Sequence, residues 1–160
     1  MTAVTFRKAE REDTGKILAF IYELAEYEHM TGDVIADEDT LNEWLFERKA
    51  AEVLFILNDG KEVGYMLFFH NFSTFLGRAG IYLEDLYVRP EFRGQGFGKA
   101  ALKELARIAA AQGCGRVEWS CLDWNEPSIK FYLSLGAVPL SEWTVYRLTG
   151  QALKDMAAKG

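Results

Sequence analysis

Several features that would indicate a special architecture are scarce or missing in this sequence. Of its 160 residues, only two are cysteines and two are histidines. Cys114 and Cys121 cannot build a disulfide framework, and neither they nor the histidines have metal-ligand spacing. No run of about 18 apolar residues occurs, so we expect no membrane-spanning helix. The residues after Met1 lack the apolar core of a secretion signal, which predicts a cytoplasmic protein.

Positive charge is missing from one long stretch of the chain. No Lys or Arg occurs between Lys16 and Arg48, whereas nine Asp and Glu residues do. The formal net charge of −6 argues against nucleic acid as the main partner. The acidic stretch has two interpretations, which are a solvated pair of helices or a site that collects positively charged amines.

Length and ordinary composition predict one compact domain over residues 1–160. The pattern of apolar residues predicts strands at 4–6, 53–57, 63–69, 80–88, 116–121 and 144–148. It predicts helices at about 13–27, 37–47, 96–112, 125–136 and 149–158. Asn58-Asp59-Gly60-Lys61 predicts a tight hairpin turn. Because hairpins alternate with helical crossovers, we expect an α/β fold with a mixed sheet and helices on both faces.

A glycine-rich loop between a buried strand and the longest helix is the most specific motif. It comprises Arg93, Gly94, Gln95, Gly96, Phe97, Gly98 and Lys99. Alternate glycines let the backbone curl tightly, so that N–H groups and the helix start can hold a pyrophosphate, with Arg93 and Lys99 adding charge. The spacing fits neither the dinucleotide fingerprint Gly-x-Gly-x-x-Gly nor a Walker A loop. A glycine-rich turn without a ligand is the alternative.

Two motifs together resemble the GNAT N-acetyltransferase superfamily. One is this loop after Tyr87-Val88-Arg89-Pro90, and the other is Asn125-Glu126-Pro127-Ser128 followed by Phe131-Tyr132. Tyr82-Leu83-Glu84-Asp85 and residues 23–28 are similar to the diamine (spermidine/spermine) branch. The resemblance covers nearly the whole chain. It implies a GNAT-like acyltransferase fold whose sheet is split at the cofactor site, acetyl-CoA as the cofactor, and a homodimer.

The resemblance also implies which residues contact the cofactor and the acceptor. Cofactor contacts are expected from Leu86, Tyr87 and Val88 through their main chain, from the loop residues 93–99, and from Asn125, Ser128 and Tyr132. Acceptor contacts are expected from Tyr27, Glu28, Glu84, Trp119 and Ser120. For Asn125, simple capping of a helix is an equally good explanation.

Glu84 and Tyr132 are the candidate catalytic residues. Glu84 is a carboxylate in an otherwise apolar strand, where desolvation raises the pKa toward that of a working base, acting directly or through water. Alternation along a strand places Glu84 and Asp85 on opposite faces, so only one should face the cleft. We expect Asp85 to be a buried structural carboxylate, and that role stays open for Glu84. Tyr132 can protonate a departing thiolate, with aromatic packing as the alternative.

The sequence therefore predicts an enzyme that moves an acetyl group from acetyl-CoA to a primary amine of a small cationic acceptor. Where the diamine branch has an acidic pair next to Gly-Trp, this chain has only Glu142, and Arg147 has the opposite sign. A short diamine, or an amino acid with a side-chain amine such as thialysine, is therefore as plausible as spermidine. The alternatives are a protein lysine or N-terminal acetyltransferase and a non-catalytic acyl-CoA-binding sensor.

Overall fold

The computed structural model describes residues 3–159, whose contacts form two compact units. The first unit extends to Ser120, and the second begins at Cys121. Each unit is described by itself. Within the described residues, no helix has both the length and the apolar character needed to cross a membrane.

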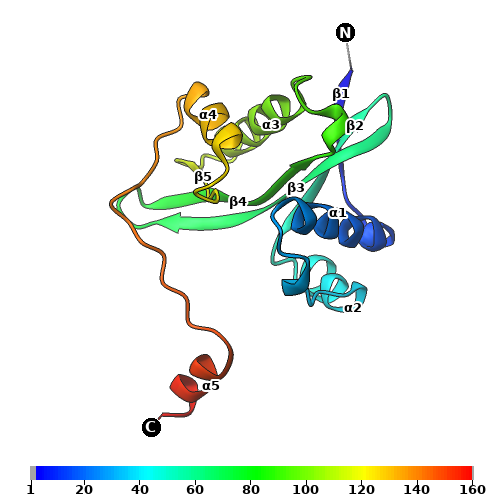
Figure 1. The fold of residues 1–160 in the computed structure, drawn as a ribbon. Coiled ribbons are helices and arrows are strands. Elements are labelled where there is room, and N and C mark those ends of the chain that lie inside the picture. The colour runs from blue at the N-terminus through cyan, green and yellow to red at the C-terminus, as the bar shows by residue number, and fades with distance from the viewer. Residues whose placement is uncertain (1–2, 160) are drawn as a thin grey trace. The chain divides into compact units, whose positions relative to one another are not determined.

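The first unit is built on a five-stranded sheet in the order β1-β2-β3-β4-β5 (Figure 1). Neighbouring strands are antiparallel except for the parallel pair of β4 and β5. The strands are β1 (Val4–Lys8), β2 (Glu52–Asn58), β3 (Lys61–Ser73), β4 (Arg78–Val88) and β5 (Val117–Trp119). This arrangement confirms the mixed sheet that the sequence predicts.

The turn between β2 and β3 has the geometry that its residues favour. Asp59 and Gly60 have φ angles of 50° and 81°. Two consecutive positive φ angles belong to the turn type whose twist matches that of the flanking strands. The predicted hairpin is confirmed, and it pairs β3 with β2 along the whole of β2.

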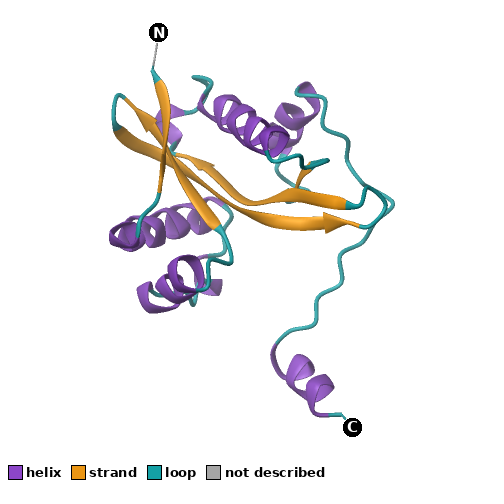
Figure 2. Cartoon of the chain, turned by 180° about the vertical axis from the view of Figure 1, so that it is seen from behind, coloured by secondary structure: helices purple, strands orange, loops and turns teal. Residues whose placement is uncertain are grey.

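Helices cover both faces of this sheet (Figure 2). The helices α1 and α2 and the π-helical segment η3 lie on one face, and α3 lies on the other. Their bounds are α1 (Thr14–Tyr27), α2 (Glu38–Leu41), η3 (Asn42–Glu47) and α3 (Phe97–Ala111), with short 3-10 turns η1 (Arg11–Asp13), η2 (Thr31–Asp33) and η4 (Pro90–Phe92). The helix predicted at 37–47 thus changes from α to π geometry at Asn42.

An aromatic cluster holds α1 against the sheet. Phe20 of α1 is 2% exposed and lies 6.1, 5.5 and 6.3 Å, between ring centroids, from Phe55, Tyr65 and Tyr87. Burying each such ring contributes about 2–3 kcal/mol. The cluster therefore fixes the middle of β3 and the end of β4, where the candidate site begins.

The second unit contains two helices and a long segment without regular structure. The helices are α4 (Glu126–Ser134) and α5 (Gly150–Ala158), which confirms both helices predicted there. The strand predicted at residues 144–148 is wrong, because this segment has no regular structure. Val145 and Tyr146 are 83% and 92% exposed, and no strand of the described chain pairs with them. A strand needs a neighbour for its main-chain groups, which an alternating pattern alone does not supply.

Candidate active site

The edge of β4 next to β5 is open along its second half. β5 pairs with β4 only at Ile81, Tyr82 and Leu83, although β4 continues to Val88. Within the described part of the first unit, Glu84–Val88 therefore have no strand partner on that edge. Unpaired main-chain groups on a strand edge are available to bind an extended ligand. The segment expected to contact the cofactor through its main chain lies on this open edge.

The side chain of Tyr87 is not available for such a contact. It is 5% exposed in the aromatic core, and its hydroxyl donates a 3.4 Å hydrogen bond to Glu23. Glu23 also forms an ion pair of 3.1 Å with Arg89. These contacts join α1 to the end of β4, so only the main chain of Tyr87 can meet a ligand.

The glycine-rich loop connects β4 and η4 to the start of α3. Gly94 and Gly96 have φ angles of 76° and 88°, in the left-handed region that favours glycine. A Cβ atom added at either position would meet no atom within 4 Å. Packing therefore does not require glycine here, whereas the backbone conformation does. The open space in front of the first turn of α3 fits an anion that approaches its N–H groups.

Phe97 and Gln95 have roles in the structure of this loop. Phe97 is 1% exposed and packs edge-on against Phe92, with 6.0 Å between ring centroids. Gln95 donates a 3.1 Å hydrogen bond to the carbonyl oxygen of Glu91. Phe97 can thus offer a ligand only its main-chain N–H, while Gly98 is half-buried and Lys99 is exposed.

Arg93 connects the loop with residues expected at the acceptor site. Its Nε donates a 2.7 Å hydrogen bond to the carbonyl oxygen of Val88. Its guanidinium lies 4.6 Å from the ring centroid of Tyr27 and 5.4 Å from that of Tyr87. A cation over a ring face is attracted by the π electrons. Arg93 therefore bridges the candidate cofactor loop and the end of α1.

A β-bulge in β4 occurs at the two neighbouring carboxylates, Glu84 and Asp85. Leu67 of β3 pairs with Asp85, but Phe68 pairs with Leu83, so Glu84 is the extra residue. Tyr82 packs on Phe69, and Asp85 bonds to Tyr65. Tyr65 and Phe69 lie on the same face of β3, so their partners Asp85 and Tyr82 lie on one face of β4. In a regular strand, residues three positions apart point to opposite faces. The strict alternation that we expected around Glu84 and Asp85 is therefore wrong.

Asp85 is the carboxylate that the protein desolvates. The pKa of Asp85 is raised to about 6, mainly by burial and in smaller part by the negative charges of Glu84 and Glu28. The buried hydroxyl of Tyr65 donates a 2.7 Å hydrogen bond to Asp85, which lowers this pKa. Glu84 is exposed. The expected burial of the Asp85 carboxylate is confirmed, whereas the desolvation expected at Glu84 is wrong, because Glu84 is the extra residue of the bulge and its side chain is exposed.

Glu28 and Tyr27 bring the end of α1 to the same region. Glu28 is the C-cap of α1, and burial raises the pKa of its carboxyl. Its charge acts on both Asp85 and Tyr65. At the end of β5, Trp119 is half-buried, and the hydroxyls of Ser120 and Tyr82 share a 2.6 Å hydrogen bond.

The remaining predicted residues lie in the second unit. Asn125 is 7% exposed, and its Oδ1 accepts a 3.4 Å hydrogen bond from the N–H of Ser128, as a cap of α4. Tyr132 is half-buried within α4, with its ring centroid 5.6 Å from that of Phe131. The capping and packing roles are thus both present.

Comparison with known proteins identifies relatives over nearly the whole chain. The sequence profile of the acetyltransferase (GNAT) family matches residues 12–137. The thialysine N-epsilon-acetyltransferase of Bos taurus is 38% identical, over 99% of this chain and 100% of that protein. The spermidine/spermine N(1)-acetyltransferase-like protein 1 of Homo sapiens is 34% identical, over 94% of this chain and 23% of that protein. A solved integron cassette protein from the mobile metagenome of V. cholerae has a TM-score of 0.82 at 27% identity, with 98% of each chain covered.

Proposed function

The chain belongs to the acetyltransferase (GNAT) family, and from this premise we propose that it acetylates a small cationic amine that carries a side-chain or terminal primary amino group. It is an acetyl-CoA-dependent N-acetyltransferase. The acceptor class is a diamine, a polyamine or an amino acid such as thialysine. The observation that supports this choice is the contact of Arg93 with Tyr27. It connects the glycine-rich loop, which can hold an anion, to the end of α1, where Glu28 acts on Asp85.

Charge supports a cationic acceptor. Glu28 and Asp85 are both partly desolvated, and each has a raised pKa. Among the described residues, neither makes an ion pair. Because desolvated carboxylates without cations are unfavourable, binding an ammonium group would relieve this cost. The ring of Tyr27, which the Arg93 guanidinium contacts, would lie beside the acceptor.

Binding of acetyl-CoA would use the open edge of β4 and the glycine-rich loop. The N–H groups of residues 94–99 would hold the phosphates, with Arg93 and Lys99 as nearby cations. Main-chain groups of Leu86, Tyr87 and Val88 would bind the pantetheine arm, and one of these amides would hold the oxyanion. When bound, acetyl-CoA supplies the acetyl group as a thioester. Asn125 and Ser128 would contribute further cofactor contacts.

Proton transfer would involve two side chains of opposite function. Glu84 at the bulge would take the proton from the acceptor ammonium, directly or through water, and Tyr132 would donate a proton to the leaving thiolate. Glu28, Trp119 and Ser120 would line the acceptor. Asp85 would set the field around Glu84, since the two charges repel each other.

Coenzyme A release from acetyl-CoA tests this proposal. The acceptors are putrescine, spermidine, spermine, lysine, ornithine, thialysine and a lysine peptide. We expect turnover with free amines and a preference for short ones, since Glu142 is the only acidic residue in the stretch 141–147. Turnover of the peptide alone would overturn the small-amine assignment. Acetyl-CoA binding without any turnover would instead favour a sensor. Glu84→Gln should lower kcat, and an unchanged kcat would exclude Glu84 as the base.

We further infer a single acetyltransferase domain over residues 1–160 and a homodimer. The family match spans residues of both units, which supports the single domain. The exposed apolar side chains of the second unit support self-association, and they include Val138, Leu140, Trp143, Val145 and Tyr146. Sedimentation that shows only an 18.2 kDa species would refute the dimer. The cytoplasmic location stays a prediction from the sequence.

A further inference from the structure

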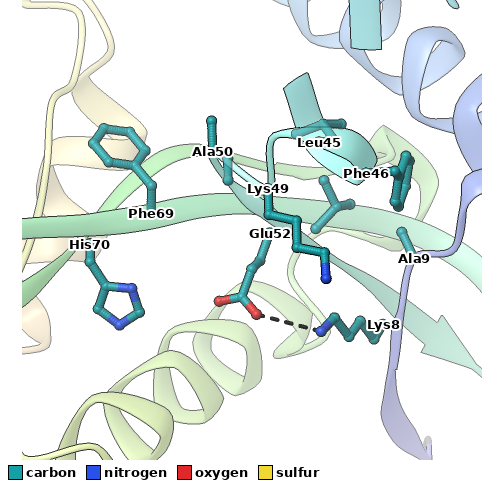
Figure 3. Close-up of a pocket in the computed structure, with 11 residues that line it drawn as sticks. Lys8, Ala9, Leu45, Phe46, Lys49, Ala50, Glu52, Phe69 and His70 are labelled. Atoms are coloured by element: carbon teal, nitrogen blue, oxygen red, sulfur yellow. Dashed lines mark ion pairs between the residues drawn. The ribbon is translucent and has the colours of Figure 1, made fainter. Parts of the chain in front are cut away.

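A cavity of about 420 Å³ lies where η3 leads into β2, in the first unit (Figure 3). None of the residues assigned above to the acetyl donor or the acceptor lines it. Its apolar wall includes Leu45, Phe46 and Phe69, and its charged or titratable groups are Lys8, Lys49, Glu52 and His70. A cavity of this size suits a small organic molecule.

The unequal lengths of the strands create this cavity. The first residue of β2, Glu52, pairs with Phe68, and β1 ends at Lys8 opposite Leu54. β3 continues past both strands to Ser73, so Phe69 and His70 extend beyond their ends. The π-helical segment η3 supplies the other wall through Leu45 and Phe46.

Lys49 stands at the mouth of the cavity in an unusual conformation. Its φ angle is 53°, in the left-handed region where glycine is the ordinary residue after a helix. Strained backbone conformations cluster at binding and catalytic sites. Among residues 3–159, Lys49 makes no ion pair. Figure 3 shows the Lys8 and Lys49 side chains extending toward the same region beside Glu52.

The charges in the cavity leave a positive excess. Glu52 accepts one ion pair, from Lys8 at 3.7 Å, and so balances one of the two lysines. His70 shares a 2.6 Å hydrogen bond with Gln112, so its Nε2 is already occupied. The net charge of the whole chain is −6, which makes a cationic cavity an exception to its overall charge. A ligand that complements this cavity carries one negative group for the exposed Lys49 and an apolar body for the phenylalanine rings.

We propose that this cavity binds a small organic anion, in which a carboxylate or phosphate group is attached to an apolar body. The anionic group meets Lys49 and Lys8 at the mouth. The apolar body packs against Phe46 and Phe69. This site is separate from acetyl transfer, and the proposal does not depend on the acceptor amine.

Binding measurements on the full chain test the site. The probes are phenylacetate and phenyl phosphate, with phenethylamine as the cationic counterpart and inorganic phosphate as the anion without an apolar body. Titration calorimetry and amide chemical shifts report the affinity and its location. We expect saturable binding of the two aryl anions, with shifts at residues 49–53 and 69–70. Equal binding of phenethylamine or of inorganic phosphate, or no binding of either aryl anion, would overturn the proposal.

Two substitutions with opposite expected effects sharpen the test. Lys49→Gly should weaken aryl-anion binding about tenfold or more, because it removes the unpaired cation. Glycine suits the positive φ, so this variant should fold and melt no lower than the original chain. Glu52→Gln should tighten binding by about two- to fivefold, because it frees Lys8. Lys103→Ala, which removes an exposed lysine of α3, is the control and should change neither aryl-anion binding nor the melting temperature. Unchanged affinity in Lys49→Gly, or weaker binding in Glu52→Gln, would refute the site.

Discussion

Replacing Asp85 by Asn should stabilise the folded chain at neutral pH and change its stability little in acid. Asn keeps the size of the side chain and an oxygen that can accept the 2.7 Å hydrogen bond from Tyr65. The substitution removes the negative charge, which burial makes unfavourable. Its effect therefore measures the cost of keeping an ionised carboxylate at this place.

The size of the stabilisation expected for Asp85→Asn follows from the shift in the pKa of Asp85. Burial raises the pKa of Asp85 from 3.8 to about 6, and each pH unit corresponds to about 1.4 kcal/mol. Because the folded pKa is higher, the folded state binds the proton more tightly than the unfolded state. The resulting stability is complete below pH 3.8 and is lost as the pH rises through about 6. At about pH 8 the Asn variant should be more stable by roughly 1–3 kcal/mol, and near pH 4 by little.

Urea unfolding at these two pH values gives the free energies. Glu84→Gln is the matched control, since it removes the same charge from the neighbouring but exposed residue. The control should change stability by no more than about 0.5 kcal/mol at either pH. An equal gain for Asp85→Asn at both pH values, or a loss near pH 8, would refute burial of the charge as the cause. A stabilised variant with a lower kcat would show that the charge serves the reaction at the expense of stability.

Three further predictions concern the loop, an ion-pair network and the second unit. Gly94→Ala should lower the free energy of unfolding by about 1 kcal/mol and weaken acetyl-CoA binding about tenfold. The control is Gly113→Ala, because Gly113 has the same φ of 76° and the same open space, and this variant should lose only the stability. Equal losses of acetyl-CoA binding in both variants would exclude the glycine-rich loop as the phosphate site. Hydrogen bonds from Lys16 and Arg7 lower the pKa of Glu62 to about 2. The ionised Glu62 therefore stabilises the folded state above pH 4.5, and this contribution is lost as the pH falls toward 2. Glu62→Gln should therefore lower the free energy of unfolding by about 1–2 kcal/mol at pH 7, and a difference that did not shrink with falling pH would contradict the linkage. Tyr132→Phe should lower kcat about tenfold or more with little change in acetyl-CoA binding, and unchanged turnover would remove Tyr132 from the mechanism.

Much of the fold could be predicted because its signals are local. The positive φ angles at Asp59 and Gly60 come from residues that tolerate them, so the β2–β3 hairpin was predictable from four letters of sequence. The left-handed conformation of Gly94 and Gly96 follows in the same way, and with it the open space before α3. Residues 144–148 show the limit, because their alternating pattern describes a strand but supplies no partner.

The sequence by itself determined the family, the glycine-rich loop and the mixed sheet, since each depends on neighbours along the chain. Tertiary structure alone decided that Glu84 is exposed and how strongly Asp85 is desolvated. The bulge that makes Glu84 an extra residue exists only in the pairing of β3 with β4, and the pKa of Asp85 depends on Tyr65, twenty positions away. The cavity beside Lys49 likewise needs β3 to extend past β1 and β2. Register, burial and electrostatic fields arise between segments that are distant in sequence, so no local pattern of residues can specify them.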